Sequence, residues 1–287
     1  MKHIRFILKA IIILWTLIIV GTLFGQYIFI LDLFSHFYLQ FFVFGIVLCI
    51  FALCLKEKIY VAISGILLIF LWFQVFPAVF EKGDMLERVD MYYINSNYYI
   101  NNYREVIWDI EKYDPKYVVI VELAPNLKHT LIEKYGRENS IIHDDGVLSY
   151  WVFSRDKILD YTKHSGTVYP FLEFHIPQGK FFVIHPLPPT KRLAAWFQKE
   201  HFWEVRNMLD ASQEKNIYIL WDFNSTHYSR VFQQYFSDLH YRVLYSWKRW
   251  HPLSIPIDYI LWNTDSFLVQ TNEFKASDHS PLLIQFD

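Results

Sequence analysis

The chain has 287 residues, of which 53% are hydrophobic and 20% aromatic, and its formal net charge at pH 7 is −2. Both cysteines, Cys49 and Cys54, lie in an apolar segment, so the rest of the chain has no thiol nucleophile, zinc–thiolate site or disulfide. Residues 81–287 carry 22 Lys and Arg against 27 Asp and Glu, which disfavours a sequence-independent DNA-binding protein.

Charged residues are rare at the start of the chain. Only seven occur in residues 1–80, and they leave uncharged stretches of 22, 23 and 22 residues at 10–31, 33–55 and 59–80. A membrane-spanning helix needs roughly 20 apolar residues, so three spans are predicted. The first is too long for a signal peptide and two more follow it, so it is interpreted as a retained anchor. We therefore expect a three-span transmembrane anchor over 1–80 and one extramembrane domain over 81–287.

The basic residues of the anchor predict its orientation. Lys2, Arg5 and Lys9 flank the first span, and Lys56 and Lys58 separate the second from the third. The link between the first two spans, residues 25–36, has no Lys or Arg. The positive-inside rule then puts the N-terminus and the turn at 56–58 in the cytoplasm. We expect a multi-pass protein of a bacterial inner membrane with residues 81–287 outside the cytoplasm.

Beyond the anchor, apolar runs typical of buried strands alternate with helical patterns. Helical spacing over 100–113 stops at Asp114-Pro115, and a long amphipathic helix is expected over 193–209 after Pro188-Pro189. The strand candidates are 89–95, 117–121, 147–153, 168–174, 180–184, 216–221, 241–245, 258–262 and 281–286. This order predicts two mixed sheets packed face to face, with helices outside and functional loops at one end.

Polar residues stand at the ends of several of these runs. They are Glu122, His185, Asp222, Asn224, Asp258, Asp278 and His279. Taken singly, most have a plain structural explanation, such as a solvated strand end, a hydrogen-bonded loop histidine or a helix cap. Asp258 is harder to explain in this way, because a buried carboxylate needs a partner. Because strand ends can converge at one edge of a sheet, these side chains predict one acidic, metal-binding pocket.

In this order, the residues resemble the endonuclease/exonuclease/phosphatase superfamily, whose fold is that of deoxyribonuclease I. The resemblance runs from about residue 89 to 287. The segments that carry it are Asn95-Ser96-Asn97, Glu122, the strand 147–153 with Ser154-Arg155, His185-Pro186-Leu187-Pro188-Pro189, Asp222-Phe223-Asn224, Ile257-Asp258-Tyr259 and Ser277-Asp278-His279. It implies a four-layer α/β fold, a two-sheet β-sandwich flanked by helices, here preceded by three transmembrane helices. The three spans and the His-Pro-x-Pro-Pro turn also resemble a bacterial branch whose substrate is poorly defined.

The resemblance implies a metal-dependent hydrolase of phosphate esters. It implies Glu122 as the principal metal ligand, with Asn95 orienting it and Asn97 beside it. Asp278 would support the ligands or hold a second metal ion. Oxygen ligands of this kind favour a hard cation, so Mg²⁺ or Mn²⁺ is expected as the cofactor.

The same resemblance implies the catalytic residues. Asp222 would position or deprotonate the attacking water, and Asn224 would hold water and phosphate. His279, oriented by Asp258, would donate to the phosphate, and His185 would be a second donor. Hydrolysis of a phosphate ester needs such donors for the charge that develops in the transition state.

Two features bear on the substrate. Trp221 stands where the family usually has glycine, which would narrow the pocket. Aromatic and basic groups at 98–103 and 245–251 could stack on a base, a sugar or a lipid head group, or could simply pack in the core and at the rim. The link of about ten residues at 81–90 reaches at most about 36 Å, which would keep the site near the membrane.

The sequence therefore predicts a membrane-anchored phosphodiesterase or phosphomonoesterase that acts outside the cytoplasm. Its expected partners are the lipid bilayer and a phosphate ester, with a lipid head group or lipid-linked sugar phosphate favoured over nucleic acid. Two alternatives stay open. One is an extracytoplasmic nuclease, and the other is a catalytically silent domain that serves as a membrane-tethered binding module.

Overall fold

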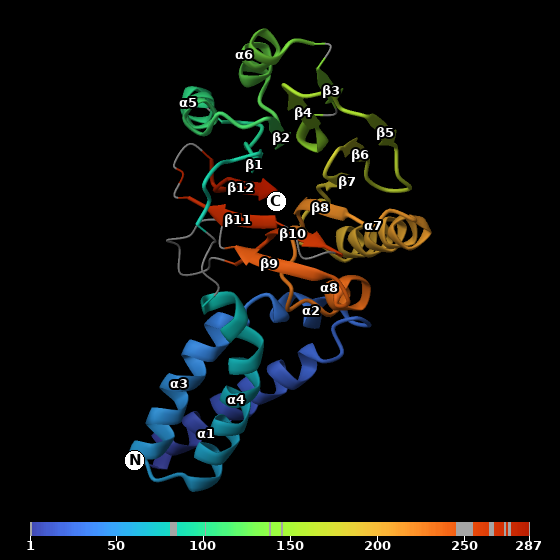
Figure 1. The fold of residues 1–287 in the computed structure, drawn as a ribbon. Helices are drawn as coiled ribbons and strands as arrows, with labels where there is room; N and C mark the ends of the chain where they lie inside the picture. The colour runs from blue at the N-terminus through green and yellow to red at the C-terminus, as the bar shows by residue number, and fades with distance from the viewer. Residues whose placement is uncertain are drawn as a thin grey trace.

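The computed structural model describes residues 2–80, 85–100, 102–137, 139–144, 146–244, 255–263, 267–272, 274 and 277–286. An apolar helical stem at the N-terminus carries a domain of two sheets (Figure 1). The boundary expected at residue 81 lies outside the described residues.

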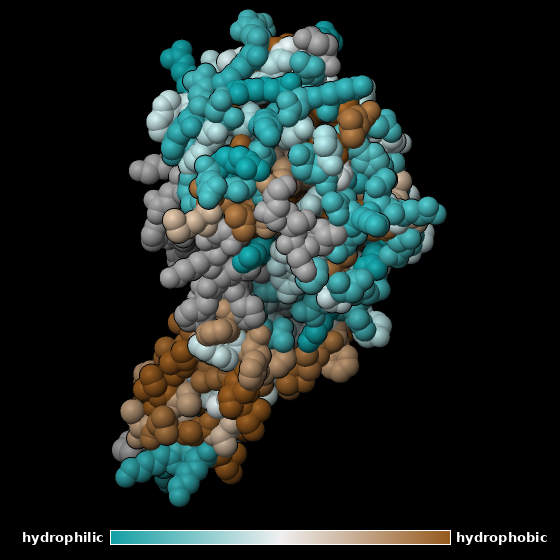
Figure 2. Space-filling model, viewed as in Figure 1, coloured by the Kyte–Doolittle hydropathy of each residue, from teal (hydrophilic) through white to brown (hydrophobic). Residues whose placement is uncertain are grey.

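Four helices form the stem. They are α1 (Lys2–Thr22), α2 (Phe29–Ser35), α3 (Tyr38–Cys54) and α4 (Lys58–Phe80). By length and composition, α1 and α4 can each cross a membrane, whereas α2 and α3 form a pair bent by 71°. The span expected over 33–55 is therefore not one straight helix, and the structure is compatible with two or three crossings. The surface of the stem is apolar up to its hydrophilic tip, in contrast to the polar surface of the domain (Figure 2).

Charged groups lie together at the end of the stem that is farthest from the two sheets. Glu57, in the turn between α3 and α4, pairs with Lys9 at 3.0 Å and with Arg5 at 3.7 Å. The N-terminus and this turn thus lie at the same end, away from the sheets (Figure 1). Within the stem, Gly45 permits close approach of α3 to α1, because a Cβ there would overlap the ring of Trp15.

The domain consists of two mixed, six-stranded sheets, as the sequence predicts. The first has the order β11-β12-β1-β2-β4-β3 and the second the order β5-β6-β7-β8-β10-β9. In each, one central pair, β1 with β2 or β7 with β8, is parallel and the other neighbours are antiparallel. The strands of the first sheet are β1 (Met91–Asn95), β2 (Tyr117–Val121), β3 (Ser140–His143), β4 (Tyr150–Ser154), β11 (Phe267–Thr271) and β12 (Leu282–Phe286). Those of the second are β5 (Asp160–His164), β6 (Phe171–Ile176), β7 (Gly179–Ile184), β8 (Ile217–Asp222), β9 (His240–Leu244) and β10 (Asp258–Trp262).

Helices cover the outer faces of both sheets. Helices α5 (Tyr103–Tyr113) and α6 (Pro125–Tyr135) pack on the first, and α7 (Arg192–Ala211) and α8 (Arg230–Phe236) on the second (Figure 1). A separate apolar core fills the space between the sheets. All five residues of β2 are buried, because helices cover one face of its sheet and the second sheet covers the other. This burial on both faces explains the continuous apolar sequence of the strand.

Several boundaries differ from the prediction. The strand expected over 147–153 begins at Tyr150, because a 3₁₀ turn occupies Gly146–Leu148. The helix expected over 100–113 begins only at Tyr103 and ends, as expected, at Tyr113; the left-handed φ of 48° at Asp114 closes its last turn before Pro115. Elements that the sequence did not predict are α2, α6, β3, β5 and β11.

Candidate active site

Strand ends from both sheets meet at one edge of the sandwich, and Asn95 joins them. Asn95 ends β1 in the first sheet, while Asp222 ends β8 in the second. Asn95 Nδ2 donates to Asp222 Oδ2 at 2.9 Å and to Glu122 Oε1 at 3.1 Å. Its oxygen accepts a hydrogen bond from the Asn97 backbone N–H at 2.9 Å. One amide thus sets the relative positions of two carboxylates that come from different sheets.

Glu122 follows β2 in an unusual backbone conformation. Its φ is 52°, in the left-handed region that non-glycine residues rarely adopt. The backbone there is fixed by a bond from Glu122 N–H to the Ser149 carbonyl and by one from Ser96 Oγ to the Glu122 carbonyl. Its second carboxylate oxygen accepts the Tyr98 N–H at 3.3 Å. Burial opposes ionisation of Glu122, but the His185 ring and these donors prevail and lower its pKa to about 2.

His185 lies between the two carboxylates. Its Nε2 contacts Glu122 Oε1 at 2.8 Å, and its Nδ1 lies 3.5 Å from Asp222 Oδ2. Its backbone N–H donates to the hydroxyl of Tyr150, which in turn donates to the Pro170 carbonyl. Burial alone would lower the pKa of His185, but the hydrogen bond with Glu122 and the charge of Asp222 outweigh burial and raise it.

Asp222 is the centre of the cluster. Its Oδ1 accepts the backbone N–H of Asn224 at 3.0 Å, in a turn where Asn224 has a φ of 48°. The Asn224 side chain is held by a bond to the Pro186 carbonyl at 2.9 Å. Asp222 is 1% exposed. Burial, with the nearby charge of Asp258, raises the pKa of Asp222 despite the two histidines beside it.

His279 and Asp258 form a buried pair on the other side of Asp222. His279 Nδ1 contacts Asp258 Oδ2 at 2.8 Å, and His279 Nε2 lies 3.6 Å from Asp222 Oδ2. Burial would lower the pKa of His279, but the charges of Asp258 and Asp222 raise it to about 10. The ring therefore favours the charged form, with Nε2 directed toward the centre of the cluster.

Asn97 and Asp278 contact each other at the edge of the cluster. Asn97 Nδ2 donates to Asp278 Oδ1 at 3.1 Å. Ser277 Oγ donates to the Asn95 carbonyl and accepts the His279 N–H, which fixes the last motif to the end of β1. In this arrangement the amide nitrogen of Asn97 faces a carboxylate.

Hydrogen bonds and close contacts between charged groups join all nine residues expected at the site. They are Asn95, Asn97, Glu122, His185, Asp222, Asn224, Asp258, Asp278 and His279. Their proximity is a finding, while their catalytic roles stay predictions. Among the described residues, Asp222, Asp258 and His279 offer metal-ligand atoms within 4.8 Å of one another.

The sequence patterns did not indicate the buried residues that support this cluster through hydrogen bonds to its backbone. In the sequence, Tyr150 cannot be distinguished from other aromatic residues of the core, yet its hydroxyl accepts the backbone N–H of His185. Gln198 lies on the buried side of α7, where its side chain donates to the Phe223 carbonyl between Asp222 and Asn224. A buried glutamine on the apolar face of a helix was the one available signal, because such a group needs a partner.

Two predictions about the residues that border the substrate pocket fall partly outside the residues that the structure describes. The basic and aromatic stretch at 245–251 and the side chain of Trp221 lie outside the described residues. Tyr98 and Tyr99 are described, and their rings meet edge to face at 5.3 Å. Tyr99 is exposed, and the Tyr98 backbone touches Glu122, so this aromatic pair stands next to the cluster.

The stem contacts the segment that follows Asp222-Phe223-Asn224. Residues 225–230, here named the docking segment, connect Asn224 to α8. His36 Nδ1 lies 3.0 Å from Thr226 Oγ1 and accepts the Thr226 N–H at 3.1 Å. Tyr228 is buried within the apolar cluster of the stem and meets Tyr38 at 5.5 Å between ring centroids.

Asp32 in α2 completes this junction. Its two oxygens accept the Ser229 hydroxyl at 2.7 Å and the Arg230 N–H at 2.6 Å. Ser229 Oγ in turn accepts the Phe232 N–H and caps α8. A carboxylate within the stem thus fixes the first turn of a helix nearly 200 positions later in the chain.

No family model and no curated protein matches the sequence. Solved structures do match. A 3′ phosphatase, NExo from Neisseria bound to a DNA hairpin product, superposes with a TM-score of 0.53 at 14% identity over 69% of this chain and 99% of its own. The fold is that of the endonuclease/exonuclease/phosphatase proteins.

Two further structures support this fold. A mannosyl-6-phosphatase from Bacteroides thetaiotaomicron has a TM-score of 0.51 at 14% identity, over 69% of this chain and 98% of its own. An endonuclease/exonuclease/phosphatase family protein from the same species has a TM-score of 0.50 at 14% identity, over 68% and 95%. The two-sheet α/β fold that the sequence resemblance implies for the domain is confirmed.

Proposed function

We propose that this protein is a membrane-anchored, divalent-metal-dependent phosphoesterase that hydrolyses a phosphodiester or phosphomonoester outside the cytoplasm. The observation that carries the proposal is the position of Asp222. Its carboxylate is held by Asn95 and faces His185 and His279, in a fold shared with a 3′ phosphatase and a mannosyl-6-phosphatase. A buried carboxylate between two imidazoles suits proton transfer to or from a water molecule.

The donor set fits a hard divalent cation. Glu122, Asp222, Asp258 and Asp278 outnumber the two histidines, so the cluster carries excess negative charge for a positive ion to neutralise. Glu122 would hold the ion, with Asn95 fixing the orientation of its carboxylate. When bound, Mg²⁺ or Mn²⁺ would polarise a phosphoryl oxygen and stabilise the negative charge that develops on it.

The residues of the chain supply the other steps. Asp222 would orient the attacking water and accept its proton, while Asn224, anchored on the Pro186 carbonyl, would hold water and phosphate in place. His279 would donate from Nε2 to a phosphoryl oxygen, since Asp258 binds its other nitrogen. His185 would be a second donor. Fixed donors of this kind stabilise the transition state without reorganising at the moment of reaction.

The stem supports the membrane anchor and its orientation. Its surface is apolar up to a hydrophilic tip (Figure 2), and Arg5 and Lys9 pair with Glu57 at that end. The positive-inside rule then predicts a cytoplasmic tip and an extracytoplasmic site. Since the docking segment fixes the domain directly on the stem, a phosphate ester of the bilayer, a lipid head group or lipid-linked sugar phosphate, is the favoured substrate.

The test is an activity screen of the full chain in detergent. Phospholipids, lipid-linked sugar phosphates, oligonucleotides and generic phosphodiesters are offered with Mg²⁺, with Mn²⁺ and with excess chelator. Turnover should need the cation and collapse in Glu122→Gln, while Glu214→Gln, a change of the same charge at an exposed position, should behave as the parent. Full activity in chelator would overturn the mechanism. Absence of turnover on every substrate with either cation would favour the silent binding module.

A further inference from the structure

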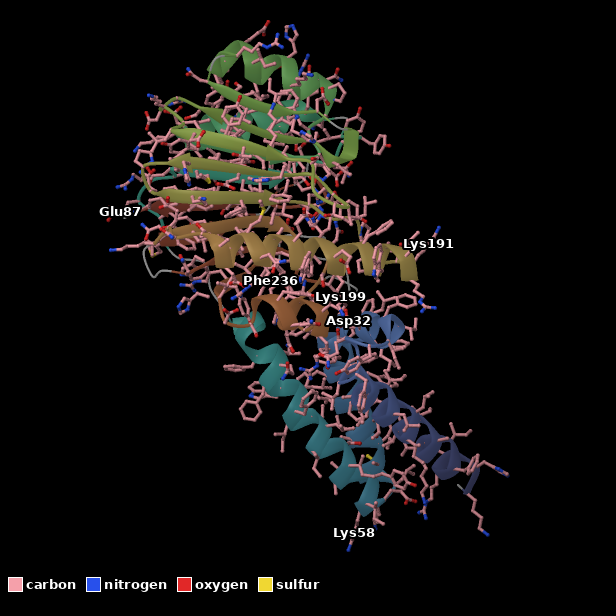
Figure 3. The ribbon with its side chains drawn as sticks, turned by 90° about the vertical axis from the view of Figure 1, so that its right-hand side faces the viewer. Asp32, Lys58, Glu87, Lys191, Lys199 and Phe236 are labelled. Carbon is pink, nitrogen blue, oxygen red and sulfur yellow. The ribbon has the colours of Figure 1, made fainter. Side chains whose placement is uncertain are left out.

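A cavity lies where the stem meets the domain. It has a volume of about 510 Å³ and opens between the segment Gly25–Leu33 of the stem and the first half of α7. We name it the α2–α7 groove. In Figure 3, Asp32 and Lys199 lie on its two sides, and Lys191 marks the beginning of α7. The groove thus lies on the border between the apolar stem and the polar domain (Figure 2).

The α2–α7 groove carries excess positive charge. Arg192 and Lys199 line it, and Asp32 is the one acidic residue on its wall. Both oxygens of Asp32 already accept hydrogen bonds, from Ser229 and from the Arg230 backbone. Within the described part of the chain, neither Arg192 nor Lys199 forms an ion pair. The two cations are therefore available to an anion from outside the chain.

The other walls of the groove are apolar and aromatic. Trp196 on α7 is 52% exposed, and Tyr27, Ile28 and Ile30 on the stem side are exposed as well. Tyr and Trp side chains of this kind concentrate where a membrane meets water, because one end of the ring is apolar and the other polar. A ligand that fits must offer an anion to Arg192 and an apolar part to these side chains.

An anionic phospholipid meets both requirements. The stem side of the α2–α7 groove is the connection between two apolar helices, α1 and α3, so a stem inserted in the bilayer places the groove at the level of the head groups. The head-group phosphate would reach Arg192 and Lys199, and the acyl chains would continue along the exposed Ile28 and Ile30. A soluble phosphate ester would leave these apolar side chains uncovered.

We infer that the α2–α7 groove binds the phosphate head group of an anionic phospholipid from the leaflet on the domain side. The inference rests on the proposed membrane anchor but not on the proposed hydrolysis. The groove also connects to the active site, because Gln198 lies on its wall and donates to the Phe223 carbonyl beside Asp222. Pro189, which lines it too, ends the turn that begins at His185. A bound lipid would thus contact the two segments that support the catalytic cluster.

The test compares lipid binding by two double variants of the full chain. Arg192→Gln with Lys199→Gln removes both cations of the groove. Lys157→Gln with Lys215→Gln removes the same charge at exposed positions away from it. Each protein is delipidated in detergent and titrated with phosphatidylglycerol or phosphatidylcholine in chelator, so that hydrolysis plays no part. Native mass spectrometry counts the bound lipid, and a thermal melt confirms that each variant is folded.

The parent and the Lys157/Lys215 variant should retain phosphatidylglycerol in preference to phosphatidylcholine. The groove variant should bind phosphatidylglycerol roughly 10- to 30-fold more weakly, because each Lys or Arg near an anionic lipid surface contributes about fivefold in affinity. Soluble glycerol phosphate and a single-stranded oligonucleotide serve as competitors. Equal retention of phosphatidylglycerol by both variants, or displacement of the lipid by either competitor, would overturn the inference. Hydrolytic activity is scored separately, so failure here leaves the proposed function standing.

Discussion

Replacing Asp32 by alanine removes the acceptor that links the stem to α8. Asp32 is 7% exposed, and its carboxylate accepts one hydrogen bond from the Ser229 hydroxyl and one from the Arg230 N–H. A buried donor that loses its partner costs about 1–3 kcal/mol, so the two donors together predict a loss of roughly 2–6 kcal/mol in the free energy of unfolding. Asp32→Asn keeps one acceptor oxygen and should lose about half as much.

The assay is thermal unfolding of the full chain in detergent, with hydrogen exchange of 226–236 as a local measure. At about 2–4 °C for each kcal/mol, Asp32→Ala should lower Tm by roughly 4–24 °C. Hydrogen exchange should rise first at the Phe232 N–H, because this group donates to the hydroxyl of the capping residue Ser229. Asp156→Ala, a change at an exposed carboxylate, is the matched control. If the Asp32 variant melts with the parent and protects 226–236 equally, the junction does not stabilise the protein and the reasoning is refuted.

Three other outcomes are expected. Asp222→Asn and His279→Ala should each lower kcat by roughly 10²-fold or more with unchanged thermal melts, and parental turnover in both would show that the assigned roles are wrong. Glu173, whose pKa the His164 ring lowers to about 2, should stabilise the fold above its ordinary pKa of 4.5 and lose this contribution as pH falls toward 2. Glu173→Gln should therefore lower stability by about 1–3 kcal/mol at pH 7 and much less near pH 2 in chemical unfolding; an equal difference at both pH values would contradict this. A reporter after the last residue should be extracytoplasmic and one inserted at Glu57 cytoplasmic, and the opposite pair would reverse the orientation.

Sequence patterns predicted the central strands, and drew attention to the polar residues at their ends, because both signals follow from burial. The strands β2, β7 and β8 are covered on both faces, so they appear as continuous apolar runs, and a polar residue at the end of each stands out. The edge strand β5 gives no such signal. The strand β5, Asp160–His164, is largely exposed and polar, and it forms because β6 offers a free edge rather than because of its own composition.

The stem forms contacts that the sequence pattern alone does not indicate. Asp32 divides two apolar stretches and therefore reads as part of a polar link, whereas it lies in α2 and binds a helix of the domain. Its partner, Ser229, lies 197 positions away, and nothing in the local sequence of either residue indicates the other. In the same way, Tyr150 is one aromatic residue among many until the fold brings its hydroxyl to His185.

The burial of Tyr228 has a consequence for how this protein can be handled. Its ring is 1% exposed and packs against Tyr38 of the stem, although it lies only four positions after Asn224. A fragment that begins after residue 80 would present this ring to water, together with donors at Thr226 and Ser229 that have lost their acceptors. Such a fragment should self-associate or melt locally beside the catalytic loop. Enzymology on a water-soluble version would therefore measure a damaged active site, and detergent or bilayer preparations of the whole chain are the appropriate material.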